Sequence, residues 1–222
     1  MFECFKSKPV KPEVSRPSKP VETVGPLNNV PFAFIVGHNS SSKGATNYLK
    51  ESEFVFNSRI ARKAQVKLES IGIASAILFR PAGRSYSSQV RDVCKQVKRI
   101  DARFGLCMHF NDASSSKATG CEVLVRDTYQ PEDENFADFL TDLMNERLGF
   151  VERHKDGVKV VGKGHNGEGM LSALAKAGCL SVLIEPCFAK DKKNAKKIFE
   201  NEDAYVSILV EAIRELVTGK LK

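Results

Sequence analysis

Short apolar runs alternate with longer segments of helical period along the chain from Phe32 onward. Each apolar run has the length of a buried strand, and the segments between them repeat their apolar residues every three or four positions. This alternation is typical of an α/β domain with a largely parallel sheet. The expected strands are residues 32–36, 73–79, 105–108, 121–125 and 180–184. The expected helices cover residues 56–68, 90–100, 136–148, a short lysine-rich segment from Asp191, and 206–217.

The first 31 residues differ in composition from the rest of the chain. They contain six of the nine prolines, interspersed with lysine and arginine. A segment of this kind has too few apolar side chains to bury a core, so we predict a flexible tail over residues 1–31. The tail is either a simple linker or a basic arm that contacts an anionic envelope. The folded domain is then expected over residues 32–222.

The charge of the chain restricts its partners only partly. With 34 Lys and Arg against 27 Asp and Glu, the formal net charge is +7, which favours anionic surroundings such as nucleic acid, membrane surfaces or wall polymer. Tryptophan is absent and no segment alternates arginine with aromatic residues, so no nucleic-acid partner is expected. No run approaches the roughly 18 apolar residues of a membrane span, so no stable membrane insertion is expected either.

Two further features concern the compartment. The segment from Met1 to Pro9 has neither an apolar core nor a small-residue cleavage site, so no export signal is expected. The six cysteines are widely spaced and form no Cys-x-x-Cys pair, which predicts free thiols in a reducing compartment. A domain of this length folds without disulfides or a structural metal, so any bound metal is expected to be functional.

Three polar side chains follow expected strands at the point where each strand ends. His38 comes just after the first strand, His109 ends the strand from Gly105, and Glu185 ends the strand from Leu180. Sites in open α/β sheets form beyond the carboxyl ends of the strands. We therefore expect these three side chains to lie along the same edge of the sheet.

Two imidazoles and one carboxylate, with a fourth position open to water, form a zinc site of the hydrolytic type. The carboxylate candidates are Glu51 and Glu53, both at the start of the first expected helix, and spacing alone does not separate them. Glu185 then remains as the group that transfers protons, and its apolar neighbours would raise its pKa as a general base requires. The alternative is that each histidine is a hydrogen-bonded structural residue and that Glu185 is paired with a lysine or arginine.

Four sequence blocks in order resemble a known enzyme family. They are residues 37–45 (GHNSSSKGA), the segment from 53 to Ile60-Ala61, residues 108–111 (MHFN) with 120–123 (GCEV), and residues 182–188 (VLIEPCF). These blocks resemble the zinc-dependent N-acetylmuramoyl-L-alanine amidases of the autolysin and phage-endolysin type, from residue 32 to about 217. The resemblance implies a single three-layer α/β domain with a twisted, mostly parallel mixed sheet flanked by helices. It also implies hydrolysis of the amide between the lactyl group of muramic acid and L-alanine.

The resemblance assigns roles to individual residues. His38 and His109 match the first and last zinc ligands of the family. The family's glutamate ligand precedes an Ile-Ala pair by seven positions, and counting back from Ile60 reaches Glu53, which favours Glu53 over Glu51. Glu185 matches the catalytic glutamate, and Zn²⁺ is the implied cofactor.

Other positions carry weaker implications. Val36 and the Pro186-Cys187 pair depart from the common family sequence, which bears on substrate fit more than on chemistry. Asn111 and His165 are predicted to contact substrate, with an incidental histidine in a flexible glycine-rich loop as the alternative for His165.

Two cysteines lie close in sequence to the candidate ligands. Cys107 and Cys121 are expected to be buried free thiols, although a thiolate is in principle able to join the metal. A fourth protein ligand would close the position that water needs, which favours the buried thiol.

The resulting interpretation is a peptidoglycan hydrolase that acts in host-cell lysis as a phage endolysin. Such an enzyme is made in the host cytoplasm without its own signal peptide and acts on the cell wall. One alternative is a zinc hydrolase of another amide, because zinc carboxypeptidases use a similar centre of two histidines and one carboxylate. Another is a non-catalytic basic module that binds wall polymer or nucleic acid. No particular oligomeric state is predicted.

Overall fold

The computed structural model describes residues 31–113 and 117–221, and in this part of the chain six strands form one mixed sheet in the order β2-β1-β3-β6-β4-β5. Four neighbouring strands are parallel to one another: β2 (Ser75–Phe79), β1 (Phe32–Val36), β3 (Phe104–Met108) and β6 (Leu180–Glu185). The other two, β4 (Glu122–Arg126) and β5 (Val158–Val161), run in the opposite direction, because β4 pairs with β6 in antiparallel orientation.

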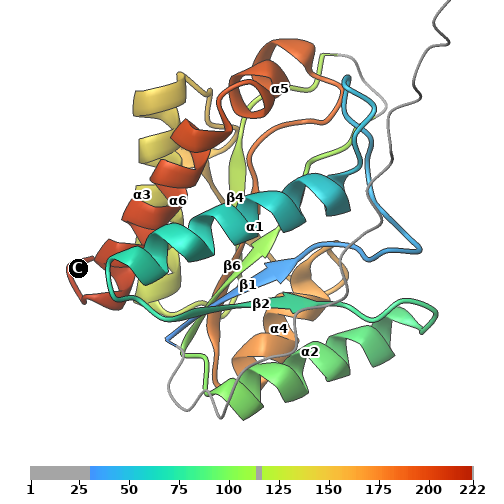
Figure 1. Cartoon of the computed structure of the whole chain (residues 1–222), viewed down its shortest axis with the longest axis vertical. Coiled ribbons are helices and arrows are strands. Elements are labelled where there is room, and N and C mark those ends of the chain that lie inside the picture. Colours follow the sequence, from blue (N-terminus) through green and yellow to red (C-terminus); the bar gives the residue numbers. More distant parts are fainter. Residues whose placement is uncertain (1–30, 114–116, 222) are drawn as a thin grey trace, which may run out of the picture.

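Helices cover both faces of the sheet (Figure 1). One face packs against α1 (Glu53–Ser70), α3 (Pro131–Leu148), α5 (Lys192–Phe199) and α6 (Glu202–Val217). The other face packs against α2 (Tyr86–Ile100) and α4 (Glu168–Lys176). Figure 1 shows α1 crossing in front of the strands, with α6 packed beside it. The predicted three-layer α/β fold is confirmed.

The central strands are buried on both faces, as expected for parallel strands covered by helices. Along β1, Phe32, Phe34 and Val36 contribute to the core under α1, whereas Ala33 and Ile35 contribute to the core under α2. This alternation follows from the two-residue period of a strand. It fixes the register of β1 firmly, because a shift by one residue would exchange the two sets of side chains.

The expected strands and helices form at the predicted places, with different ends. The first helix begins at Glu53, three residues before the expected start, which brings Glu53 into its first turn. The sequence analysis missed β5, α4 and a short 3-10 helix, Lys155–Gly157. The two larger elements have only 4 and 9 residues and lie among several glycines, so their periodicity is too short to recognise.

Two further predictions concern the ends of the chain and the membrane. The predicted tail lies outside the described residues, except for Pro31. No helix in residues 31–113 and 117–221 combines the length and apolar character needed to cross a bilayer.

Candidate active site

The carboxyl ends of β1, β3 and β6 lie side by side and bring the three predicted polar side chains to one edge of the sheet. His38 comes two residues after β1, His109 directly follows β3, and Glu185 is the last residue of β6. All three line a cleft of about 750 Å³. Another cavity, of about 510 Å³, lies near Ala102 and Gly178 at the opposite edge and contains none of the candidate residues.

His38, Glu53 and His109 form a compact cluster in which the potential ligand atoms all lie within 4.8 Å of one another. Nε2 of His38 is 3.2 Å from Oε2 of Glu53, and Nδ1 of His109 is 3.0 Å from Oε1 of Glu53. The side chain of Glu53 is 1% exposed, whereas the two imidazoles are partly exposed to the cleft. This is the donor set of a hydrolytic zinc site, with the imidazoles reached from solvent.

Glu53 is held in place by backbone groups from two other segments. Its carboxylate accepts hydrogen bonds from the backbone N–H of Ala45, at 3.0 Å, and of Phe110, at 2.8 Å. Burial alone would raise the pKa of Glu53, but contacts with His109 and His38 outweigh it and lower the pKa to about 2. The cluster therefore contains a buried, ionised carboxylate.

Two glycines allow the backbone to approach these side chains closely. A Cβ atom at Gly37 would lie 2.6 Å from Cε1 of His109, and one at Gly44 would overlap Glu53 and lie 2.8 Å from Nε2 of His38. Gly44 also has a φ of 76°, and His38 itself has a φ of 62°. Left-handed backbone at a non-glycine residue costs energy and is concentrated at functional sites.

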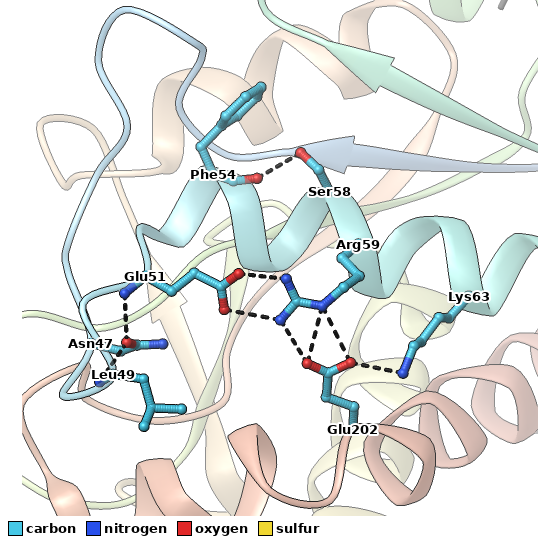
Figure 2. Close-up of polar contacts among 8 residues, drawn as sticks. All are labelled: Asn47, Leu49, Glu51, Phe54, Ser58, Arg59, Lys63 and Glu202. Carbon is cyan, nitrogen blue, oxygen red and sulfur yellow. Dashed lines mark hydrogen bonds and ion pairs between the residues drawn. The ribbon is translucent and has the colours of Figure 1, made fainter. Parts of the chain in front are cut away.

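Glu51, the other carboxylate candidate, lies outside this cluster. Figure 2 shows its carboxylate directed toward Arg59, with which it forms an ion pair. Arg59 also pairs with Glu202 of α6, and Nζ of Lys63 lies 2.8 Å from the same carboxylate. Glu51 is thus part of a charge network that joins α1 to α6. Of the two candidates that spacing left open, only Glu53 lies beside the histidines.

Glu185 lines the cleft and faces a second acidic residue, Glu122, across the antiparallel pair of β6 and β4. Burial, together with a hydrogen bond to the Glu122 side chain and its negative charge, raises the pKa of Glu185. The nearby negative charge of Glu122 therefore makes the Glu185 carboxylate a stronger base than an isolated glutamate.

Glu122 is almost fully buried, with 1% exposure, and binds four further side chains. Its carboxylate accepts a hydrogen bond from Nδ2 of Asn111 at 2.6 Å. It also lies near three basic groups: Nε of Arg153 at 3.0 Å, Nε2 of His154 at 2.8 Å and Nζ of Lys159 at 3.4 Å. Burial would raise the pKa of Glu122, but its hydrogen bonds and these basic groups lower it.

The sequence analysis gave no role to Glu122. The residue begins its strand, and the rule that places sites at the carboxyl ends of parallel strands directs attention away from that position. Because β4 is antiparallel to β6, its first residue reaches the same edge as the last residue of β6. The available signal was the position of Glu122 within the 120–123 block.

The two residues predicted to contact substrate both line the cleft. The side-chain nitrogen of Asn111 already donates to Glu122, whereas His165 is exposed, with Nδ1 2.6 Å from the backbone oxygen of Asn166. Contact with substrate stays a prediction for both residues.

The cysteines of the described residues are free thiols, as predicted. Cys107 and Cys121 are buried, and burial is the main reason why the pKa of each is raised, in the case of Cys121 to about 12. Neither belongs to the cluster of potential metal ligands.

Residues 33–218 match the N-acetylmuramoyl-L-alanine amidase family. The catalytic domain of CwlV, an amidase from Bacillus (Paenibacillus) polymyxa var. colistinus, is a similar structure, with a TM-score of 0.64 and 17% identity over 86% of this chain and 98% of that chain. An amidase from Clostridium difficile 630 has a TM-score of 0.66 and 21% identity, over 87% of this chain and 100% of that chain.

The catalytic domain of an endolysin that targets Clostridia difficile is also similar. It has a TM-score of 0.66 and 18% identity, over 85% of this chain and 96% of that chain. No curated protein sequence matches the chain. At these identities the structural similarities establish the fold, and the family match establishes the relationship. The chain therefore belongs to the N-acetylmuramoyl-L-alanine amidase family, and it is an enzyme of that family.

Proposed function

We propose that this amidase hydrolyses the bond between the lactyl group of N-acetylmuramic acid and L-alanine in peptidoglycan, using a zinc ion bound by His38, Glu53 and His109. The observation that supports the metal site most directly is the 4.8 Å cluster of their ligand atoms. Family membership argues against a carboxypeptidase-like reaction and against a non-catalytic binding module. In this proposal residues 32–222 form the catalytic domain, and Asn111 and His165 contact the substrate.

The charges around Glu53 fit a bound cation. This buried carboxylate is ionised, and within residues 31–113 and 117–221 no lysine or arginine forms an ion pair with it. Its ion-pair partners in this part of the chain are the two imidazoles, and a buried carboxylate is costly unless positive charge compensates it. A divalent metal between two imidazoles and one carboxylate would supply that compensation and leave a position open toward the cleft.

The chain's own residues then account for the proton transfers. Bound zinc lowers the pKa of water to about 7 and polarises a carbonyl group. The carboxylate of Glu185 accepts the proton of the attacking water, and the same group donates it to the nitrogen of the departing alanine. Without that second transfer the nitrogen would leave as an unstable anion. Glu122 holds Glu185 in position, and its negative charge makes the Glu185 carboxylate a stronger base, so that Glu185 takes up the water proton and carries it to the nitrogen.

Replacing Glu122 with glutamine is expected to lower kcat by about 10-fold or more, because Glu122 positions Glu185, and a positioned general acid and base contributes about 10²–10⁴-fold. The negative charge of Glu122 contributes to the raised pKa of Glu185, so its removal lowers that pKa. Glu185 acts as a base when ionised, and the acidic limb of the kcat/KM profile should therefore move to lower pH. The measurement is the pH dependence of kcat/KM.

The matched control for this variant is Glu152→Gln, because Glu152 bonds to the exposed Asn145. It should keep both the rate and the pH profile of the unaltered protein. Glu122 would have only a structural role if its glutamine variant lost thermal stability and activity in parallel, with the acidic limb unmoved.

Chelation of the metal is expected to abolish hydrolysis of purified peptidoglycan, and addition of Zn²⁺ is expected to restore it. The reason is that activation of water and carbonyl both depend on the ion. The measurement follows new N-terminal alanine, which appears only when the lactyl amide is cut. Zinc-loaded protein that releases no alanine amine from intact wall would contradict the proposed reaction.

We propose in addition that the enzyme acts in host-cell lysis, after synthesis in the host cytoplasm. This proposal is supported by the similarity to an endolysin catalytic domain. In this proposal the enzyme itself binds peptidoglycan, and a separate membrane-permeabilising protein gives it access to the wall.

A further inference from the structure

Arg80 is a basic residue of the active-site cleft that the proposed reaction does not use. It directly follows β2, whose last residue, Phe79, is in register with Val36 of β1. Arg80 consequently lies at the same edge of the sheet as His38, and its Nε donates a hydrogen bond to the backbone oxygen of His38 at 3.2 Å. The guanidinium group is thus fixed beside a proposed metal ligand.

Arg80 forms no ion pair with a carboxylate of the described residues, and Glu53 acts on its charge only from a greater distance. Within residues 31–113 and 117–221, no acidic group lies within ion-pair distance of it, and its two terminal nitrogens donate no hydrogen bond. The arginines that do pair with carboxylates are Arg59, Arg84, Arg147, Arg153 and Arg214.

The surroundings of Arg80 hold it in one orientation. The residue is half-buried, and its Cζ atom lies 5.4 Å from the centroid of the Tyr86 ring. Burial lowers the pKa of Arg80, but a guanidinium remains charged at neutral pH. A half-buried guanidinium group whose terminal nitrogens donate no hydrogen bond within the protein is a suitable binding site for an anion. Arginine binds carboxylates through two parallel hydrogen bonds.

The chemistry of the substrate indicates which anion this is. In intact peptidoglycan the lactyl carboxyl group forms the scissile amide and carries no charge, and the N-acetylated sugars are neutral. The carboxylates therefore belong to the peptide stem. The first of them is the α-carboxyl group of the second residue, a glutamate linked through its γ-carboxyl, and it lies one residue beyond the alanine that is released.

We propose that Arg80 binds a carboxylate of the peptide stem and that the cleft thereby prefers stems whose second residue has a free α-carboxyl group over stems in which it is a carboxamide. This inference rests on the proposed amidase function and adds a substrate preference to it. Tyr86 packs against the guanidinium group, and the hydrogen bond to His38 keeps this group, with the stem bound to it, beside the proposed metal site.

The test uses two N-acetylmuramoyl tripeptides that differ only in this group, which is a free acid in one and a carboxamide in the other. We expect the unaltered enzyme to cleave the acid with a kcat/KM about 10–100-fold higher, the range for a charged hydrogen-bonded pair. In Arg80→Gln, kcat/KM for the free acid should fall by about the same 10–100-fold, and kcat/KM for the carboxamide should change by less than about threefold.

Arg84→Gln is the matched control, because Arg84 is exposed and pairs with Asp92, 2.9 Å away, outside the cleft lining. It should keep the preference of the unaltered enzyme. Equal cleavage of both substrates by the unaltered enzyme would overturn the inference. So would an equal loss on both substrates in Arg80→Gln, which would assign Arg80 to the reacting centre or to the support of His38.

A binding measurement separates this inference from the proposed function. The free tripeptides, as acid and as carboxamide, are titrated into the unaltered protein and into Arg80→Gln, and heat is recorded. If the unaltered protein binds the acid more tightly than the carboxamide and Arg80→Gln does not, the result supports the role of Arg80. This conclusion holds even if no substrate is cleaved. Absence of cleavage would reject the amidase reaction and not the role of Arg80. Indistinguishable binding of the four combinations would reject the role of Arg80.

Discussion

Replacing Glu185 with alanine is expected to reduce hydrolysis of the lactyl amide by about 10²–10⁴-fold, the contribution of a positioned general acid and base. The expected loss has a simple reason: the variant has no group to accept the proton of water or to return it to the alanine nitrogen. Zinc content and binding to purified wall should be unchanged, because Glu185 is not in the His38, Glu53 and His109 cluster. Release of N-terminal alanine measures hydrolysis, metal analysis measures the zinc content, and sedimentation with purified wall measures binding to the wall.

The control for Glu185→Ala is Glu146→Gln, an exposed position on α3 that should keep full activity.

In cells, the unaltered chain should cause lysis only when a membrane-permeabilising protein is made with it, and Glu185→Ala should cause none. Retention of more than about a tenth of the activity by Glu185→Ala would remove Glu185 from the reaction. Lysis by the chain alone would argue against the proposed dependence on a second protein.

Replacing Glu53 with glutamine is expected to weaken zinc binding by more than about 100-fold and to abolish hydrolysis. Loss of an outer-shell partner already costs metal sites about 10–100-fold, and loss of a charged ligand should cost more. The buried carboxylate also provides the negative charge that a divalent cation requires at this place. The measurement is zinc bound per chain after dialysis against a series of competing chelators.

Glu51→Gln is the control that the sequence itself offers, because Glu51 lies two positions away on the same segment. It should keep zinc and activity and lose at most about 1 kcal/mol of stability, since its partner Arg59 is 39% exposed and exposed ion pairs contribute little. The ligand assignment is wrong if Glu51→Gln loses zinc and Glu53→Gln retains it.

Local sequence patterns determined most of the fold and the common position of three side chains of the site. The short continuous apolar runs and the three-to-four-residue period of the segments between them predicted an α/β sheet, because a strand covered on both faces is apolar throughout and a helix is apolar along one face. The ends of the apolar runs then placed His38, His109 and Glu185 together, since parallel strands end at the same edge. The resemblance to the amidases, rather than any spacing rule, preferred Glu53.

Only the tertiary structure decided the remaining features of the site. It separates Glu53 from Glu51 by pairing Glu51 with Arg59, and within the described residues it leaves Arg80 without an ion pair. It also brings Glu122 to the carboxyl end of Glu185's strand, because β4 runs antiparallel to β6. The direction in which a strand pairs depends on contacts between residues far apart in the chain, and the local pattern of apolar residues is the same in either direction.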